Sequence, residues 1–486
     1  MRASRVSARW QGASEAEAER RGRAAGSRTR IGGTGIFRIL VALVLLAPLP
    51  LGSVYPLSWA LMAAVVGVLL VAHSLSIVVG SPSITQTPGA MWSWLVPFLL
   101  VAAWAAMQGT SLTPSSWHHP LWAEAAAALD TKISGSISLD PFETISALLR
   151  LLAYGGIFWL ALHLCRAPQR AEAVFVGLSV AGLLYAAYGL AVKFTGSNTV
   201  LWYSNPYYSG VVTSTFVNRN NYATYAGLGL ICTTGMIIKL YSEAMSLPSR
   251  GHVRAVAIIE AVTGRSWALV PSWIVTITAL LLTASRGGVF SSLIGLVALV
   301  GAVRFAKILR RRQAVVMGAA VVVCGAAFLL FSGEKLAERL AYPITSPEER
   351  SSVYALTLKA ITDRPWLGTG YGTFEEAFYL YRDETVHHGH YDKAHDTYLE
   401  NALELGVPAE VLLTLSLGSL LVRCVVGALK RRQDAIYPCV GVGATLLVAS
   451  HSVVDFPLQI PAIAATYALI MGAAVAQSWR SSELPT

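Results

Sequence analysis

The sequence has little charge. Asp, Glu, Lys and Arg make up 13% of its 486 residues, whereas an ordinary soluble domain contains about 25%. Hydrophobic residues make up 54%, and the mean hydropathy is +0.55. A chain this apolar and this poor in charge excludes an ordinary water-soluble domain and predicts an integral membrane protein.

The sequence also lacks cysteine motifs. Its five cysteines fall inside or beside apolar stretches, and no two have the CxxC spacing of a zinc or redox motif. They are Cys165, Cys232, Cys324, Cys424 and Cys439. We expect buried thiols that behave as small hydrophobic side chains, without disulfides or metal ligation.

The N-terminus has no apolar run. Residues 1–38 contain nine Arg and three Glu, which predicts a basic, disordered cytoplasmic tail over residues 1–36. The apolar run that follows, from Ile39 to about Tyr55, has no cleavage site of the small-residue type and leads straight into another apolar segment. We interpret it as a first membrane helix, because a removed signal peptide would end in such a site.

Apolar stretches long enough to cross a bilayer recur along the chain. The predicted segments are 37–55, 57–79, 89–108, 144–165, 171–193, 220–240, 267–284, 287–305, 313–331, 405–427, 436–454 and 458–478. The expected fold is therefore all-α, with about twelve membrane helices. Helices 1–9 occupy residues 37–331, helices 10–12 occupy 404–478, one large loop occupies 332–403, and a short tail occupies 479–486.

The distribution of Lys and Arg predicts the orientation of these helices. With the Arg-rich tail in the cytoplasm, alternate loops hold most of the basic residues, and both termini are cytoplasmic. The basic residues on the cytoplasmic side are Arg166, Arg170, Lys239, Arg250, Arg254, Arg265, Arg304, Lys307, Arg310, Arg311, Arg312, Arg423, Lys430, Arg431, Arg432 and Arg480. The formal net charge of +10 thus reflects membrane topology, and we expect no nucleic-acid partner.

Two arginines on the opposite, outer side lie at the ends of predicted membrane helices. Arg219 begins the sixth predicted helix, and Arg286 lies in the turn before the eighth, followed by Gly287 and Gly288. Arg binds phosphate oxygens in a bidentate way, and a helix N-terminus favours an anion. The two arginines predict a phosphate site, although either one alone is consistent with a side chain that reaches to the lipid headgroups.

The large loop contains three closely spaced glycines, Gly368, Gly370 and Gly372. No Gly-Lys-Ser/Thr follows them, so this is not a phosphate-binding loop of the Walker type. We expect a structural turn.

A histidine-rich stretch follows the turn. Its spacing fits no standard zinc pattern. His395 differs from the other histidines because it begins a predicted helix that runs into the tenth membrane helix, close to the outer membrane surface. An imidazole there can act as a general base. Asp455 lies at the outer end of the eleventh helix, with His451 one turn before it, and we expect it to pair with Arg286 or His395.

Several motifs together resemble one known family. They are Phe216-Val217-Asn218-Arg219-Asn220, Ser285-Arg286-Gly287-Gly288, Asp363-Arg364-Pro365-Trp366-Leu367-Gly368-Thr369-Gly370, His395-Asp396-Thr397-Tyr398 with Glu404-Leu405-Gly406, and His451-Ser452-Val453-Val454-Asp455-Phe456-Pro457. In this order, on a map of twelve helices with a large loop between helices 9 and 10, the chain resembles the O-antigen ligase and polymerase superfamily of bacterial inner-membrane proteins. The resemblance covers most of the chain from about residue 37.

The resemblance implies transfer of a glycan from undecaprenyl diphosphate to an acceptor hydroxyl on the periplasmic face, without metal or cofactor. By the same resemblance Arg219 and Arg286 bind the donor diphosphate and His395 is the catalytic base, with His387, His388 and His390 as competing candidates. Residues expected to support the site are Asn218, Asn220, Asp396, Tyr398 and Asp455.

The acceptor stays open at this stage. The hypothesis placed first is a ligase with lipid A-core as acceptor, and a growing polysaccharide or a protein hydroxyl would make the chain a polymerase or a protein O-oligosaccharyltransferase. A transporter of lipid-linked sugar is the alternative of another class. It is disfavoured because segments such as 287–303 and 405–422 carry little or no charge along their middle.

Overall fold

The computed structural model describes residues 33–79, 91–205, 208, 210–246, 267–331, 347–386, 391–431 and 433–479. Most of the predicted tail, residues 332–346 of the large loop, and His387, His388 and His390 lie outside the described residues.

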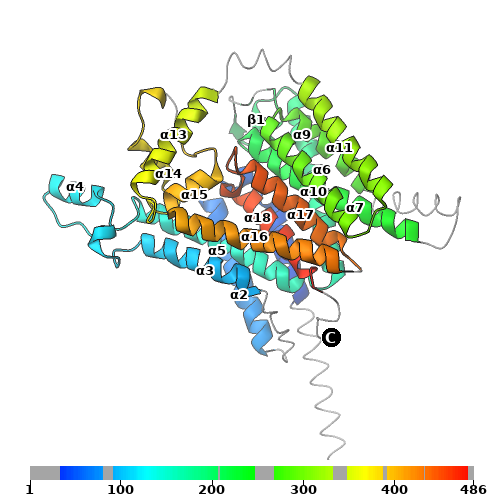
Figure 1. Ribbon diagram of the computed structural model, residues 1–486, viewed down its shortest axis with the longest axis horizontal. Helices are drawn as coiled ribbons and strands as arrows, with labels where there is room; N and C mark the ends of the chain where they lie inside the picture. Colours follow the sequence, from blue (N-terminus) through cyan, green and yellow to red (C-terminus); the bar gives the residue numbers. More distant parts are fainter. Residues whose placement is uncertain are drawn as a thin grey trace, which may run out of the picture.

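Helices make up nearly all of the described structure (Figure 1). They are a helix at Gly33–Leu46, α2 (Pro56–Val79), α3 (Trp92–Gln108), α4 (Leu121–Ala128), α5 (Pro141–Leu164), α6 (Pro168–Phe194), α7 (Arg219–Ser246), α9 (Leu269–Leu282), α10 (Arg286–Phe305), α11 (Arg311–Phe331), α13 (Pro347–Asp363), α14 (Phe374–Tyr379), α15 (Thr397–Leu405), α16 (Val407–Lys430), α17 (Ile436–His451) and α18 (Pro461–Ala476). Single 3-10 turns occur at η1 (Leu51–Ser53), η3 (Ser115–Trp117), η5 (Glu384–Val386) and η6 (Pro457–Gln459). Strands β1 (Thr199–Val200) and β2 (Tyr203–Ser204) form one small antiparallel hairpin.

Each of the twelve predicted membrane segments overlaps one apolar helix. In the described part of the chain, α2, α5, α6, α7, α10 and α16 are long and apolar enough to span a membrane by length and composition. The helix at Gly33–Leu46, α3, α9, α17 and α18 are apolar but shorter. An almost entirely helical fold with six candidate membrane spans in the described residues is confirmed. The number twelve and the position of the large loop between helices 9 and 10 stay predictions.

The first predicted segment is shorter in the structure than the hydropathy pattern suggested. Its helix ends at Leu46, and a turn with Pro48 and Pro50 follows. Proline has no backbone N–H and so cannot continue the helical hydrogen bonds. The apolar run is longer than the helix because the turn itself is apolar.

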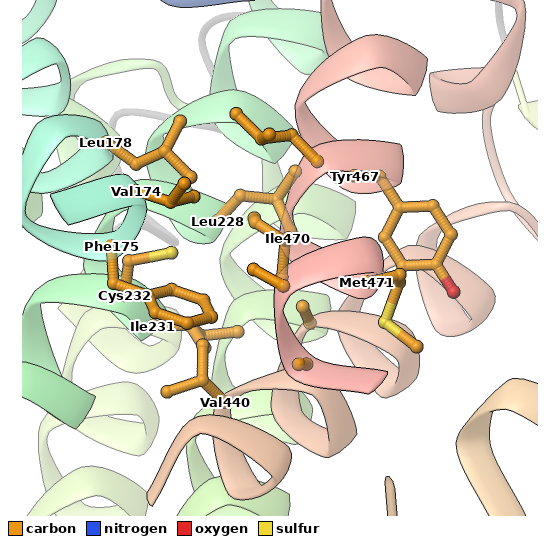
Figure 2. Packing of buried hydrophobic residues seen from close by; sticks show 14 of the residues in the cluster. Val174, Phe175, Leu178, Leu228, Ile231, Cys232, Val440, Tyr467, Ile470 and Met471 are labelled. Carbon is orange, nitrogen blue, oxygen red and sulfur yellow. The ribbon is translucent and has the colours of Figure 1, made fainter. Parts of the chain in front are cut away.

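Helix α18 lies at the centre of the bundle. Every residue from Pro461 to Ala476 is buried, as expected for a helix that is apolar on all sides. Figure 2 shows Ile470 of α18 beside Leu228 of α7, with Phe175 of α6 and Val440 of α17 in the same cluster. The surrounding helices therefore pack against one another through α18.

The described part of the large loop forms a small domain at one end of the bundle. This cap, residues 347–386 and 391–405, contains α13, α14 and α15, which lie together in Figure 1. It has its own apolar core, which includes Val353, Phe374, Phe378 and Leu403. The cap is also joined to the segment between α4 and α5, because the Leu139 amide donates to the Thr369 carbonyl at 2.8 Å.

The three glycines of the loop form the structural turn that the sequence predicts. Gly368, Gly370 and Gly372 all have positive φ, at +70°, +108° and +87°. A Cβ on Gly368 would overlap the Glu404 carbonyl oxygen, and one on Gly370 would overlap Ser138. Close approach of the turn to α15 and to the segment between α4 and α5 thus requires glycine.

The helix that follows His395 does not continue into the next membrane helix, contrary to the sequence-based expectation. The chain breaks at Gly406, where φ is +81°, so that α15 and α16 are separate. A Cβ on Gly406 would lie 2.6 Å from the Trp366 carbonyl oxygen. The glycine turn packs into this break, and α15 therefore belongs to the cap.

Replacement of Gly370 by alanine should destabilise the protein by at least about 2 kcal/mol, because the new side chain meets both backbone strain and Ser138. Thermal unfolding of the purified protein in detergent measures the loss. The matched control is Gly301→Ala in α10, where nothing lies within 4 Å of an added Cβ. Equal unfolding temperatures for the two variants would contradict the assigned role of the turn.

Candidate functional site

The two outer arginines are the first residues of two helices that meet. Arg219 begins α7 and Arg286 begins α10. These ends are in close contact, because a Cβ on Gly288 of α10 would overlap the side chain of Ala223 of α7. The positive ends of two helix dipoles and two guanidinium groups therefore lie at the same end of the bundle.

Local side chains cap both helix starts. The Asn218 side-chain oxygen accepts from the Asn220 amide at 2.8 Å, and the Ser285 hydroxyl accepts from the Gly288 amide at 3.1 Å. Each cap satisfies a backbone donor that the helix leaves free. Asn218 and Asn220 thus fix the position from which Arg219 projects.

His451 joins the two arginine-bearing helices to the end of α17. Its Nδ1 is 2.6 Å from the Thr224 hydroxyl of α7. A Cβ on Gly287 of α10 would lie 3.2 Å from its Nε2. When Thr224 donates to Nδ1, the ring proton of His451 is on Nε2, which faces the Asp455 carboxylate at 4.0 Å.

His395 lies next to the same carboxylate. Its Nδ1 is 3.6 Å from Asp455 Oδ1, and one fifth of its side chain is exposed. This separation is within ion-pair range but too long for a direct hydrogen bond. The ring also makes an edge-to-face contact with Phe456 at 5.0 Å between centroids. The expectation that Asp455 pairs with His395 is confirmed.

Several hydrogen bonds fix the start of α15 on the end of α17. Asp396 caps α15 by accepting from the Tyr398 and Leu399 amides at 2.9 and 3.0 Å. The Thr397 amide donates to the Ser452 carbonyl at 2.8 Å, and the Tyr398 hydroxyl donates to the Ala449 carbonyl at 3.1 Å. These contacts connect the cap to the bundle.

His395 has a left-handed backbone conformation, with φ of +56°. Non-glycine residues rarely adopt it, and it is found where the surrounding structure enforces it, often at functional sites. Here the Tyr354 hydroxyl of α13 donates to the His395 carbonyl at 2.9 Å, while Asp396 caps the helix on the other side. In this conformation the imidazole Nδ1 faces the Asp455 carboxylate.

The electrostatics of the site keep Asp455 ionised. Burial alone would raise the pKa of Asp455, but the adjacent His395 and His451 outweigh it and hold the pKa of this carboxyl below its usual value. Burial raises the pKa of Asp396, and the two amides that it caps partly offset this effect. Asp455 is therefore a carboxylate at neutral pH, able to hold an imidazole proton.

A largely apolar cavity of about 620 Å³ lies beside this polar cluster. Its walls come from α3, α5, α16, α17 and α18, and include Trp94, Phe98 and Leu417. At one side the lining contains Thr397, Tyr398 and Ser452, which are neighbours of His395 and His451 in the chain. An apolar ligand chain in the cavity would end close to the polar site.

The structure places the predicted site residues in two groups. His395, Asp396, Tyr398 and Asp455 lie where the cap meets α17, and Arg219 with its flanking Asn218 and Asn220 lies at the start of α7, next to Arg286 at the start of α10. His451 contacts both groups through Thr224 and Asp455. No group of three metal-ligating side chains with the geometry of a metal site occurs within the described residues.

Sequence reasoning missed four members of this region. Thr224 and Tyr354 have ordinary hydroxyl side chains, and nothing in the sequence marks their contacts with His451 and His395. Tyr208 lies 6.0 Å under the Arg219 guanidinium, in a loop rich in Tyr. The fourth, Arg350 of α13, is another arginine on the predicted outer side, and the criterion that found Arg219 and Arg286 could have found it.

The fold and site define a class: an α-helical membrane protein with a cluster of arginine, histidine and aspartate at one end of an apolar bundle. Comparison with known families is more specific. Residues 271–414 match the family model described as O-Antigen ligase, so the chain carries a domain of the O-antigen ligase superfamily. This confirms the resemblance indicated by the motifs. The superfamily consists of enzymes of the glycosyltransferase or ligase type.

The matched segment runs from α9 to the first part of α16, and it contains Arg286, the cap and His395. Arg219, His451 and Asp455 lie outside it. A search of curated proteins found no match to the chain.

Removal of the Thr224 hydroxyl should leave Nδ1 of His451 without its partner. We expect Thr224→Val to lower the free energy of unfolding by about 1–3 kcal/mol, the usual effect of an unsatisfied buried polar group. Thermal or denaturant unfolding in detergent measures it. Thr278→Val in α9 is the control, because its exposed hydroxyl bonds only to its own helix. A loss no larger than that of the control would show that this hydrogen bond does not stabilise the site.

Proposed function

We propose that this protein transfers a glycan from undecaprenyl diphosphate to an acceptor hydroxyl at the periplasmic face of the bacterial inner membrane, in the manner of an O-antigen ligase with lipid A-core as acceptor. The observation that carries the proposal is the meeting of two arginine-bearing helix N-termini with the His395–Asp455 pair at one end of the bundle. The first group suits a diphosphate, and the second suits proton removal.

The donor in this proposal has an anionic and an apolar part. Arg219 and Arg286 bind the diphosphate, assisted by the amides at the two helix starts. The cavity between α3, α5 and α16 to α18 has the apolar walls that a polyprenyl chain requires. The match of residues 271–414 to the O-antigen ligase model supports a lipid-linked glycan as substrate in general terms.

The proposed reaction is a direct displacement. The acceptor oxygen forms a bond to the anomeric carbon, and the bond from that carbon to the diphosphate oxygen breaks. The diphosphate leaves with both electrons and its polyprenyl chain, and the two arginines stabilise the developing charge. One displacement inverts the anomeric configuration. Because the guanidinium groups supply the positive charge, the proposal requires no metal.

His395 is the proposed base. It takes the proton of the acceptor hydroxyl, and the buried Asp455 carboxylate stabilises the imidazolium that forms and holds the ring in position. Asp396 and Tyr398 act through the backbone and helix contacts that place His395. The exposure of one fifth of the His395 side chain leaves room for an acceptor to approach.

Variants of the three principal residues test this assignment. His395→Ala should lower glycan transfer by about 10²–10⁴-fold, and Arg219→Ala and Arg286→Ala should each lower it by at least about tenfold, because each removes a charge-assisted contact. Transfer is measured in membranes by the conversion of lipid-linked glycan, at matched protein level. Arg304→Ala, at the opposite end of α10 from Arg286, is the control and should transfer normally.

Normal transfer by all three variants would refute the proposal.

A separate experiment, with a strain that lacks the protein, identifies the acceptor. Long glycan that accumulates on the lipid carrier without attachment indicates a ligase, and attachment of a single repeat indicates a polymerase. Loss of glycan from protein alone indicates a protein O-oligosaccharyltransferase.

A further inference from the structure

Helix α13 of the cap directly contacts the backbone of the proposed base. The Tyr354 hydroxyl donates to the His395 carbonyl at 2.9 Å. Arg350 precedes Tyr354 by four residues on the same helix, and residues four apart lie on one face. The face of α13 that is turned toward His395 therefore also carries an arginine.

The charge of Arg350 acts on groups that surround the site. One of them is His451 at the end of α17. Arg350 also lowers the pKa of Tyr208, the residue under Arg219, and that of Tyr354, although burial raises both pKa values more strongly. Arg350 therefore lies close enough to act electrostatically on residues of α17 and of the loop that contains Tyr208, in addition to its own helix.

Arg350 has an unused hydrogen-bond donor. Its Nε is buried and has no partner within the described residues. Asp455 does not ion-pair with it in the part of the chain that the structure describes. The Asp455 carboxylate faces His395 and His451 instead, and its Oδ1 accepts from the Phe456 amide at 2.9 Å. A buried N–H donor without a partner is destabilising unless an acceptor binds there.

We propose that Arg350 is a third arginine of the donor site and binds a phosphate of the lipid diphosphate opposite Arg219 and Arg286. This inference rests on the proposed function and extends it. The large loop then supplies a binding residue in addition to the base, and the anion site is complete only when the cap is docked on the bundle. Binding of the diphosphate would in turn hold the cap, and thereby His395, in place.

The test uses the purified full-length protein in detergent and farnesyl diphosphate as a short polyprenyl diphosphate, with tryptophan fluorescence as the measure of binding. Arg350→Ala should raise the Kd by about 10- to 100-fold, the effect of one lost charge-assisted contact. Arg350→Lys should show a smaller increase, because it keeps the charge but not the bidentate geometry. Lys359→Ala is the matched control, since Lys359 is an exposed cation of the same helix.

Two further measurements separate a binding role from a structural one. Farnesol, which lacks the phosphates, should bind equally to the wild type and to Arg350→Ala. Tyr354→Phe should bind the diphosphate normally, because it removes only the contact with the His395 carbonyl. An unchanged Kd for farnesyl diphosphate in Arg350→Ala, or an equal loss of farnesol binding, would overturn the inference.

The outcome for the other arginines distinguishes failure of this inference from failure of the proposed function. If Arg219→Ala and Arg286→Ala weaken diphosphate binding while Arg350→Ala does not, the donor site stands and Arg350 is outside it. If none of the three variants weakens binding, the proposed donor site is itself wrong. A lower unfolding temperature for Arg350→Ala leaves Arg350→Lys as the variant that decides.

Discussion

The contact between His395 and the buried Asp455 joins the two parts of this molecule. The histidine belongs to the cap, and the aspartate belongs to the turn after α17 in the bundle. Two hydrogen bonds beside it connect the same two parts: the Thr397 amide donates to the Ser452 carbonyl, and the Tyr398 hydroxyl donates to the Ala449 carbonyl. Because Asp455 is buried and ionised, it requires the positively polarised groups that face it. The His395–Asp455 contact thus lies at the centre of the contacts that join the cap to α17.

The bundle contributes helix ends to this junction, and the cap contributes a strained residue. In a membrane the backbone forms its hydrogen bonds within helices, so free amides are available only where helices begin. Helices α7 and α10 both begin with arginine, and their small residues Ala223 and Gly288 let these ends approach closely. In the cap, the Tyr354 hydroxyl on the His395 carbonyl helps to maintain the positive φ of His395. Arg350 lies on the same helix, four residues before Tyr354.

The sequence predicted the helical fold, the approximate location of each apolar helix, the glycine turn, and a partner for Asp455 that was either Arg286 or His395. These features depend on local composition, on the backbone freedom of glycine and on the scarcity of charge in lipid. Each of these properties can be read from a single stretch of the sequence. The helix boundaries were less certain, as the turn after Leu46 and the break at Gly406 show. Both are places where apolar sequence continues although the backbone direction changes.

Only the tertiary structure decided which residues meet. Thr224 and His451 are 227 residues apart in sequence, and Tyr354 and His395 are 41 apart. Their contacts depend on how helices pack, and no periodicity along the chain encodes that. By itself the sequence predicted a helical membrane protein and marked Arg219 and Arg286 as arginines at unusual positions. The packing of α7, α10, α13 and α17 decided which of these residues lie close together, because buried polar groups must find partners across helices.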